Sequence, residues 1–283
     1  MNKSLLAENA INSWRQWGVG LSRRPVILKP LGGGRSNHSF LLDSDGTRMV
    51  LRINGPDLLL PNASRDREYA IWRVASEQGI APPVLYVDEQ KGLLVSTYIN
   101  NNLAPRPALE RGIIKQIFYL LKRCHQLEVE ASTIDYCRHI ERYWSIIEDN
   151  NKSVNPALIK QREPMQLLLE SLTNSGTETG LCHHDPVVAN FVGNADRLYL
   201  IDWEYAAIGL LVMDYAALSV EWKIDDATIL ERTGIAPALL IMAKTLYSYI
   251  CDLWEAQNGP RVRCRDAPYV VRAHGCAKRP SPG

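Results

Sequence analysis

The chain has 283 residues, of which 46% are hydrophobic, and a formal net charge of +1. This length suits one large domain or two modest domains, each with a core of its own. The balanced charge argues against nucleic acid or an anionic membrane surface as the main partner.

The N-terminus and the cysteines indicate the cellular compartment of the protein. Residues 1–17 have the pattern of an amphipathic helix interrupted by polar residues, without the continuous apolar core of a signal peptide. No apolar run is long enough to span a bilayer. The six cysteines are scattered without a CxxC pair, which favours reduced thiols over a disulfide framework. We therefore expect a cytoplasmic protein with no membrane partner.

The first predicted elements are two strands around a glycine-rich turn. Residues 26–28 and 39–42 are short β-rich runs, and glycines occupy positions 32–34 between them. Strands on both sides of the glycines differ from the strand-to-helix setting of a Walker loop and are typical of the hairpin that covers nucleotide phosphates in protein-kinase-like folds. Glycine backbone N–H groups can approach phosphate oxygens closely. The alternative is a mobile hairpin tip without a ligand.

A third strand, residues 49–53, carries Arg52 inside an apolar run, where a charged side chain needs a partner or a ligand. The segment 64–75 has helical spacing, with Ser64 as a suitable cap. Glu68 lies near the start of this helix and could pair with Arg52. The alternative is an ordinary surface glutamate on a charged helix.

The remaining chain changes from β-rich to mainly helical. Two further strands and a polar boundary are expected at 84–87, 93–99 and 100–102. Helical spacing of apolar residues then predicts helices at 108–125, 138–149, 164–172, 213–223 and 237–256. We therefore divide the chain into a first lobe, a second lobe and an irregular tail, at 1–99, 100–258 and 259–283.

One stretch of the second lobe gathers oxygen-bearing side chains. Apolar runs flank the turn-rich segment 193–196, which predicts a β-hairpin. Because a hairpin returns the chain to its starting point, Asn190 and Asp202 should lie side by side at its open end. Asp185 lies in a loop just upstream. Two carboxylates and an amide in this arrangement suit Mg²⁺ and its phosphate ligands, which is the chemistry of phosphoryl transfer.

The run Cys182-His183-His184-Asp185 also suggests a zinc site. Consecutive residues of an extended strand point to opposite faces, so they cannot jointly form one tetrahedral site. A calcium site built from the same oxygens would lack the EF-hand pattern. A kinase-type site is therefore the favoured interpretation.

Several features follow one another along the chain in a characteristic order. A glycine-rich hairpin precedes a basic residue on the third strand and a helical glutamate; His183-His184-Asp185 with Asn190, and then Ile201-Asp202-Trp203-Glu204-Tyr205, come after them. This order resembles the choline/thiamine kinase family of the aminoglycoside phosphotransferase superfamily, over about residues 25–222. The resemblance implies an α+β, two-lobed protein-kinase-like fold. Its N-terminal lobe would be an antiparallel β-sheet with one helix, and its C-terminal lobe mainly α-helical.

The resemblance also implies ATP and Mg²⁺ as cofactors and a small-molecule alcohol as the phosphoryl acceptor. Asp185 would be the catalytic base, supported by His183, while Asn190 and Asp202 would hold Mg²⁺. Residues 94–99 would form the hinge beneath adenine. The residues expected to bind the nucleotide are Gly33, Gly34, Ser36, Asn37, Arg52, Glu68, Thr97 and Ile99.

The acceptor is expected on the second lobe, where aromatic and acidic side chains accompany these motifs. The candidates are Tyr143, Trp144, Glu204, Tyr205, Glu221 and Trp222. Such a set could bind a quaternary ammonium or thiazolium cation through cation–π contacts, although helical aromatics also serve as core packing. The predicted function is an ATP-dependent kinase for a small cationic alcohol such as choline or thiamine. The alternatives are an aminoglycoside or sugar phosphotransferase of the same fold, and a non-catalytic nucleotide-binding scaffold.

Two stretches depart from the family pattern. The family commonly has a Gly-Asp-Pro-like run after the metal-binding aspartate, whereas this chain has Ile208-Gly209-Leu210-Leu211-Val212-Met213-Asp214. We expect Asp214 to keep a buried polar role, while the preceding loop, which faces the acceptor, differs. The basic tail after Gly259 also departs, because relatives usually finish in helices.

Overall fold

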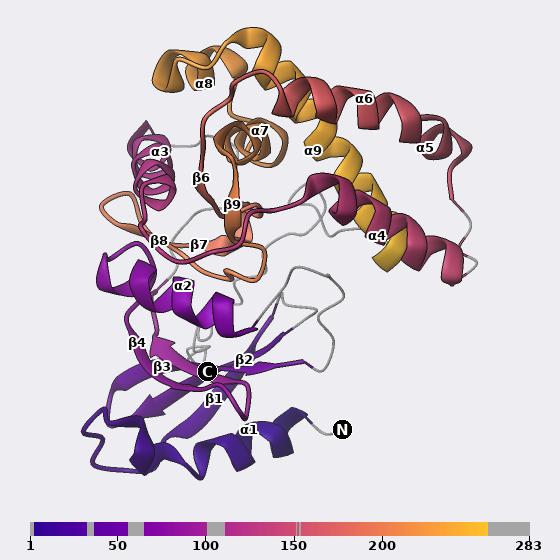
Figure 1. Ribbon diagram of the computed structural model, residues 1–283. Coiled ribbons are helices and arrows are strands. Elements are labelled where there is room, and N and C mark those ends of the chain that lie inside the picture. The colour runs from indigo at the N-terminus through magenta and orange to yellow at the C-terminus, as the bar shows by residue number, and fades with distance from the viewer. Residues whose placement is uncertain are drawn as a thin grey trace, which may run out of the picture.

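The computed structural model describes residues 3–32, 37–55, 65–100, 111–150, 152 and 154–259. One part is built on a β-sheet and the other mainly on helices, and the two lie one above the other (Figure 1). This arrangement confirms the predicted α+β fold. Because the sheet ends at Thr97 and the next helix begins at Arg111, we keep the lobe bounds 1–99 and 100–258 as a proposal. The tail beyond Gly259 lies outside the described residues.

The N-terminal sheet is antiparallel throughout, with the strand order β1-β2-β3-β5-β4. Asp45 and Gly46 make the tight turn between β2 and β3, both with positive φ (50° and 85°), as two-residue hairpin turns require. The strands are β1 (Val26–Leu31), β2 (Asn37–Ser44), β3 (Thr47–Asn54), β4 (Val84–Asp88) and β5 (Leu93–Thr97).

Helices cover both faces of this sheet (Figure 1). Helix α2 (Arg65–Glu77) covers one face, and α1 (Lys3–Ile11) with the 3₁₀ turn η1 (Trp14–Trp17) covers the other. Successive side chains of β5 point to opposite faces of the sheet, so the strand contributes to the hydrophobic core on each side. Leu94 packs into the cluster that contains residues of α2, while Leu93 packs into the cluster that contains Trp17. The expectation of one helix in this lobe therefore omits α1, although a helix is expected at residues 1–17.

In its described residues, the second part contains the five predicted helices, with bounds shifted by a few residues, and two short helices that the sequence pattern did not predict, α5 and α8. Helices α4, α6, α7 and α9 pack around one shared hydrophobic cluster. The bounds are α3 (Arg111–His125), α4 (Tyr136–Asp149), α5 (Pro156–Lys160), α6 (Arg162–Thr173), α7 (Leu211–Glu221), α8 (Asp226–Thr233) and α9 (Pro237–Asn258).

Two small antiparallel sheets lie on the side of the helical part that faces α2 (Figure 1). Strands β7 (Phe191–Gly193) and β8 (Leu198–Leu200) form the predicted hairpin, preceded by the 3₁₀ turn η2 (Val188–Asn190). Strand β6 (Thr179–Cys182) pairs with β9 (Ala207–Leu210), a pairing that the sequence pattern did not predict. These two sheets carry the loops that form the site.

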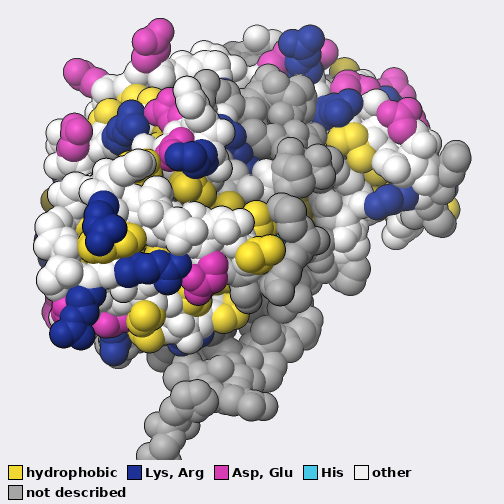
Figure 2. Space-filling model, turned by 90° about the horizontal axis from the view of Figure 1, so that it is seen from below, with side chains coloured by type: hydrophobic (Ala, Val, Ile, Leu, Met, Phe, Trp, Pro, Cys, Tyr) yellow, Lys and Arg dark blue, Asp and Glu magenta, His cyan; other side chains and the backbone are white. Residues whose placement is uncertain are grey.

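The described surface agrees with the balanced charge of the chain. Seen from below, Lys and Arg side chains are interspersed with Asp and Glu and with hydrophobic side chains (Figure 2). Across the described ranges, even the longest helix, α9, lacks the apolar character needed to cross a membrane. The cysteines in these ranges are free thiols, three of them buried, at Cys124, Cys137, Cys182 and Cys251.

Candidate active site

The hairpin brings the two predicted metal ligands to adjacent chain ends. Phe191 pairs with Leu200, and the Ile201 N–H donates to the Asn190 carbonyl at 3.0 Å. Asn190 and Asp202 therefore flank the open end of the hairpin, as the sequence predicts. Asp202 has a φ of 67°, an uncommon conformation for a residue with a side chain and one that concentrates at functional sites.

Asn190 also holds the loop that carries Asp185, residues 183–190, called here the Asp185 loop. The side-chain Nδ2 of Asn190 donates to the Asp185 carbonyl at 2.9 Å and to the Asp185 carboxylate at 3.0 Å. With its amide N–H groups engaged in this way, Asn190 offers its amide oxygen as a ligand atom. Asp185 and the two hairpin residues are thus linked in one local structure.

Asp214, on the first turn of α7, anchors the beginning of this loop from the interior. Its carboxylate accepts the backbone N–H groups of His183 (2.9 Å) and His184 (2.8 Å) and the Nε2–H of His125 (3.0 Å). Burial opposes its ionisation, but the hydrogen bond from His125 and the nearby imidazoles lower the pKa of Asp214 to about 2. Asp214 is fully buried. It has the buried polar role expected from the sequence, and it stabilises the positive φ of 62° at His184.

His183 connects the Asp185 loop to the segment that carries Asp202. Its Nε2–H donates to the carbonyl of Ile201 at 3.1 Å, and its ring packs against Trp203 with 4.9 Å between ring centroids. Both His183 and Trp203 are fully buried. This position agrees with a supporting function for His183 rather than direct contact with a substrate.

Predicted nucleotide-binding residues of the first lobe meet the hairpin. Arg52 on β3 forms an ion pair with Glu68 of α2, with 2.6 Å between Nη2 and Oε1, and both side chains are almost completely buried. Nη1 of Arg52 and Nδ2 of Asn37 each lie 3.5 Å from Oδ1 of Asp202. The pairing of Arg52 with Glu68 is confirmed, and its alternative, a surface glutamate, is excluded.

Carboxyl groups are crowded at this junction. Burial, and then the carboxylates of Asp202 and Glu68, raise the pKa of Glu204 to about 8. Burial also raises the pKa of Asp202, although 31% of its side chain stays exposed. Within the described part of the chain, Nε and Nη1 of Arg52 have no hydrogen-bond partner. Carboxylate oxygens beside such guanidinium donors fit a divalent cation with a phosphate ligand.

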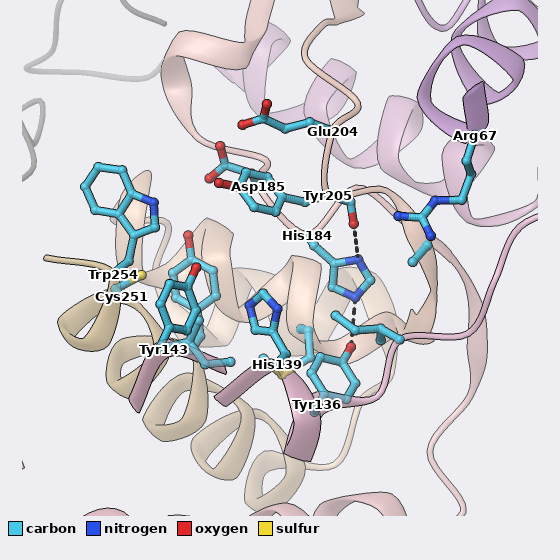
Figure 3. Close-up of a pocket in the computed structure, with 15 residues that line it drawn as sticks. Arg67, Tyr136, His139, Tyr143, His184, Asp185, Glu204, Tyr205, Cys251 and Trp254 are labelled. Carbon is cyan, nitrogen blue, oxygen red and sulfur yellow. Dashed lines mark hydrogen bonds between the residues drawn. The ribbon is translucent and has the colours of Figure 1, made fainter. Parts of the chain in front are cut away.

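A pocket opens beside Asp185, between the Asp185 loop and helices α4 and α9 (Figure 3). Asp185 and Glu204 supply carboxylates at one side, and His139 and His184 contribute imidazoles. Burial lowers the pKa of each of these histidines to about 4, so both are neutral near pH 7. The aromatic lining consists of Tyr136, Tyr143, Tyr205, Tyr247 and Trp254.

The structure separates the predicted acceptor residues into two groups. Glu204, Tyr205 and Tyr143 line the pocket, whereas Trp144, Glu221 and Trp222 do not. The indole N–H of Trp144 donates to the Tyr249 hydroxyl (3.0 Å) and that of Trp222 to the Pro186 carbonyl (2.8 Å), both in the buried core. Successive helical residues are about 100° apart around the axis, so Tyr143 can face the pocket while Trp144 faces the core.

The sequence did not identify several pocket residues. His139 precedes Tyr143 by one helical turn on α4, and Tyr247, Cys251 and Trp254 share one face of α9. This spacing is visible in the sequence. It is also the spacing of a buried helix face, so it could not by itself indicate a pocket.

The zinc alternative needs one correction. Strand β6 ends at Cys182, and the following residues turn away, so the run is not extended as the sequence argument assumed. Among the described residues, the His, Cys and acidic ligand atoms that come within 4.8 Å of one another belong to His125, Cys182 and Asp214. Both carboxylate oxygens of Asp214 already accept backbone N–H groups of the Asp185 loop, so its burial needs no metal ion as an explanation.

The remaining predicted nucleotide residues are not joined to this site by the described contacts. Thr97 ends β5, where its N–H donates to the Pro83 carbonyl at 2.9 Å, and Ile99 lies two residues further along. Gly33, Gly34 and Ser36 lie outside the described residues. Nucleotide binding by all five stays a prediction.

Comparisons with known proteins identify the family and the fold of the chain. LicA of Haemophilus influenzae is 28% identical to this chain, and the match covers 67% of this chain and 56% of LicA. A thiamine kinase of Escherichia coli is 30% identical, and the match covers 66% of this chain and 64% of the thiamine kinase. The chain thus spans less than two thirds of these relatives. Choline kinase LicA from Streptococcus pneumoniae shares the fold with a TM-score of 0.71 at 22% identity, covering 89% of this chain and 91% of that one.

A structure of LicA in complex with AMP has a TM-score of 0.68 at 22% identity, and the match covers 89% of this chain and 88% of that one. These likenesses confirm the predicted two-lobed kinase-like fold. Residues 27–243, most of the chain, match the sequence profile described as the phosphotransferase enzyme family. The chain therefore belongs to the phosphotransferase enzyme family.

Proposed function

We propose that the protein is an ATP- and Mg²⁺-dependent kinase that phosphorylates a hydroxyl group of a small cationic alcohol such as choline or thiamine. The observation that carries this proposal is the pocket, which joins Asp185 and Glu204 to a wall of aromatic side chains (Figure 3). An acceptor bound there would present its hydroxyl beside Asp185. Family membership and the LicA structure solved with AMP support the nucleotide as the second substrate.

Asp185 is the proposed general base. It lines the acceptor pocket, and the Asn190 amide holds its carboxylate at 3.0 Å. In that position it would accept the proton of the acceptor hydroxyl as the oxygen attacks the phosphoryl group. His183 would act through the loop, since its contacts are to the Ile201 carbonyl and Trp203.

The nucleotide and its metal belong at the junction of the two lobes. Asn190 and Asp202 would hold Mg²⁺, which when bound neutralises charge on the phosphate oxygens. Arg52 would donate to the phosphates through Nε and Nη1, while Glu68 fixes its guanidinium group. Asn37 contributes a further amide at this junction. Gly33, Gly34, Ser36, Thr97 and Ile99 complete the proposed nucleotide site.

The Asp185 carboxylate and the aromatic lining of the pocket favour a cationic acceptor. Glu204, with its pKa raised to about 8, is mostly protonated near pH 7 and offers a hydrogen-bonding carboxyl group, while the neutral states of His139 and His184 add no positive charge. Arg67, from α2, also lines the pocket, and its guanidinium donates to the Ser132 hydroxyl. Aromatic faces stabilise a quaternary ammonium or thiazolium group by about 0.5–2 kcal/mol per ring.

A screen of ATP consumption over candidate acceptors tests this proposal. The panel contains choline, ethanolamine, thiamine, aminoglycosides and simple sugars, each assayed with and without Mg²⁺. We expect Mg²⁺-dependent turnover with a small cationic alcohol. Turnover only with an aminoglycoside or a sugar would contradict the acceptor class, and turnover with none of the panel would favour the nucleotide-binding scaffold.

A further inference from the structure

A chain of hydrogen bonds along one wall of the acceptor pocket connects α4, β9 and the segment that carries Tyr205 (Figure 3). The Tyr136 hydroxyl lies 2.9 Å from Nε2 of His184 and accepts the backbone N–H of Leu210 at 3.2 Å. Nδ1 of the same imidazole lies 3.2 Å from the Tyr205 carbonyl. One side chain, Tyr136, therefore contacts the strand β9 and, through His184, the segment that follows Asp202.

The partners of His184 determine where its proton lies. A carbonyl oxygen can only accept, so Nδ1 must carry the proton that is donated to Tyr205. Nε2 is then an acceptor, and the Tyr136 hydroxyl donates to it while accepting the Leu210 N–H. Burial, which lowers the pKa of His184 to about 4, keeps the imidazole in this neutral form near pH 7. All three hydrogen bonds run in one direction, towards Tyr205.

The backbone packs closely against this chain of hydrogen bonds at Gly209 and is unusual at His184. His184 has a φ of 62°, so its conformation depends on contacts made by the rest of the structure. A Cβ atom on Gly209 would lie 2.5 Å from Nε2 of His184 and 2.7 Å from the Tyr136 hydroxyl oxygen. Glycine at position 209 is therefore needed for the close packing of β9 against both side chains. This is the stretch in which the chain departs from the family pattern.

We propose that Tyr136 is a positioning residue, whose hydroxyl orients His184 and thereby sets the placement of Asp185 and Tyr205 in the acceptor pocket. The inference rests on the proposed function of that pocket. The hydrogen-bond chain involves none of the nucleotide residues of the first lobe: Arg52 and Glu68 pair with each other, and Asn37 contacts Asp202 and Glu204. Its loss should therefore affect the acceptor and leave nucleotide binding intact.

Kinetics of Tyr136→Phe, which removes only the hydroxyl, test the positioning role. We expect kcat/KM for the acceptor to fall roughly 10- to 100-fold, because small misplacements of reacting groups have effects of this size. Affinity for ATP should stay within about twofold of wild type, as expected when only acceptor-side interactions are lost. In Gly209→Ala the added methyl group would collide with His184 and Tyr136. This variant should likewise lose kcat/KM for the acceptor and keep its affinity for ATP.

Tyr249→Phe is the matched control. Tyr249 is also a buried tyrosine whose hydroxyl accepts one N–H, that of Trp144 at 3.0 Å, but it lies in the core and does not line the pocket. We expect both variants to lose thermal stability, and only Tyr136→Phe to lose acceptor turnover. Equal kinetic effects in the two variants, or a parallel loss of ATP affinity in Tyr136→Phe, would overturn the proposal.

Nitrogen NMR of the wild-type protein tests the hydrogen-bond chain without any assay of activity. With ¹⁵N-labelled histidine, and with His184 assigned by its loss in His184→Asn, the ring should show a protonated Nδ1 and an unprotonated Nε2 at pH 7. A protonated Nε2 would overturn the proposal. If the acceptor screen finds no substrate but this tautomer is observed, the proposed function fails while the role of Tyr136 in ordering the pocket stands.

Discussion

At the scale of single residues, Asn190 holds Asp185 through hydrogen bonds from its side-chain amide to the carbonyl and the carboxylate of Asp185. Asp202, in contrast, belongs to the crowded junction with Glu204, Arg52 and Asn37. The two carboxylates thus have different surroundings: one faces the acceptor pocket, the other faces the nucleotide residues. This difference separates the expected effects of replacing them.

Replacing Asp185 with asparagine should affect the chemical step. The substitution keeps the size of the side chain and removes the base, so kcat should fall roughly 10²- to 10⁴-fold. ATP affinity should change little, because Asp185 lines the acceptor pocket rather than the lobe junction. Steady-state kinetics with a nucleotide-binding titration check both points. Unchanged turnover in the variant would rule out Asp185 as the base.

Replacing Asp202 with alanine should affect the nucleotide instead. Loss of this carboxylate removes a proposed Mg²⁺ ligand, so calorimetry should detect no Mg²⁺-dependent gain in ATP affinity. Asp196→Ala is a suitable control, because Asp196 is an exposed aspartate at the opposite end of the same hairpin. Retained Mg²⁺-dependent binding in Asp202→Ala would contradict the metal site.

At the scale of elements, the β7–β8 hairpin is the unit that aligns the predicted metal ligands. Its turn depends on Gly193, which has a φ of 127° and lies so close to the Arg197 carbonyl that a Cβ atom would collide with it. The hairpin register keeps Phe191 opposite Leu200 and therefore Asn190 close to Asp202. A distortion of the turn would be transmitted along strands of only three residues.

Gly193→Ala should therefore destabilise the protein and weaken Mg²⁺·ATP binding together. Backbone strain alone would lower the free energy of unfolding by about 1–3 kcal/mol, and the collision with Arg197 adds to it. Gly176→Ala provides the control, because Gly176 also has a positive φ (71°) but has open space around it, so only about 1–2 kcal/mol is expected. Urea denaturation of both variants compares them; equal losses would show that the close approach at Gly193 is unimportant.

At the scale of the whole molecule, buried histidines of the helical lobe link global stability to pH. Burial lowers the pKa of His139 and of His184 from 6.5 to about 4 in the folded protein. Between about pH 4 and 6.5 the unfolded chain binds more protons at these residues than the folded chain does. The stability that these two histidines contribute therefore rises with pH across this window and is lost as the solution is acidified. Glu204 has the opposite sign, because its pKa is raised from 4.5 to about 8 in the folded protein, and its contribution is lost as the pH rises through that range. Asp214, with a pKa of about 2, contributes its loss at lower pH.

The contribution of each histidine to the free energy of unfolding should accordingly increase between pH 5 and pH 6 by up to about 1.4 kcal/mol per pH unit. His139→Phe keeps an aromatic ring and removes one of the two groups, so the slope should fall by that amount. Denaturant unfolding at several pH values measures it. An unchanged slope in the variant would show that His139 is protonated equally in the folded and unfolded chains.

Two contacts of the lobe junction could be predicted from the sequence because their signals are local. The hairpin pattern placed Asn190 near Asp202, and a charge within an apolar strand required a partner for Arg52, which the structure identifies as Glu68. The five long helices followed from apolar spacing for the same reason. Short elements such as α5, α8 and β6 with β9 have too few residues for a periodic pattern.

The acceptor pocket was decided by tertiary structure. Its walls come from α4 and α9, which are far apart in the chain, and a helical aromatic has the same spacing whether it faces a pocket or the core. Tyr143 and Trp144 are neighbours in sequence, yet one lines the pocket and the other donates to Tyr249 in the interior. The rotation of α4 against its neighbours makes that choice, because packing of whole helix faces, not local sequence, determines which side chains remain open to a ligand.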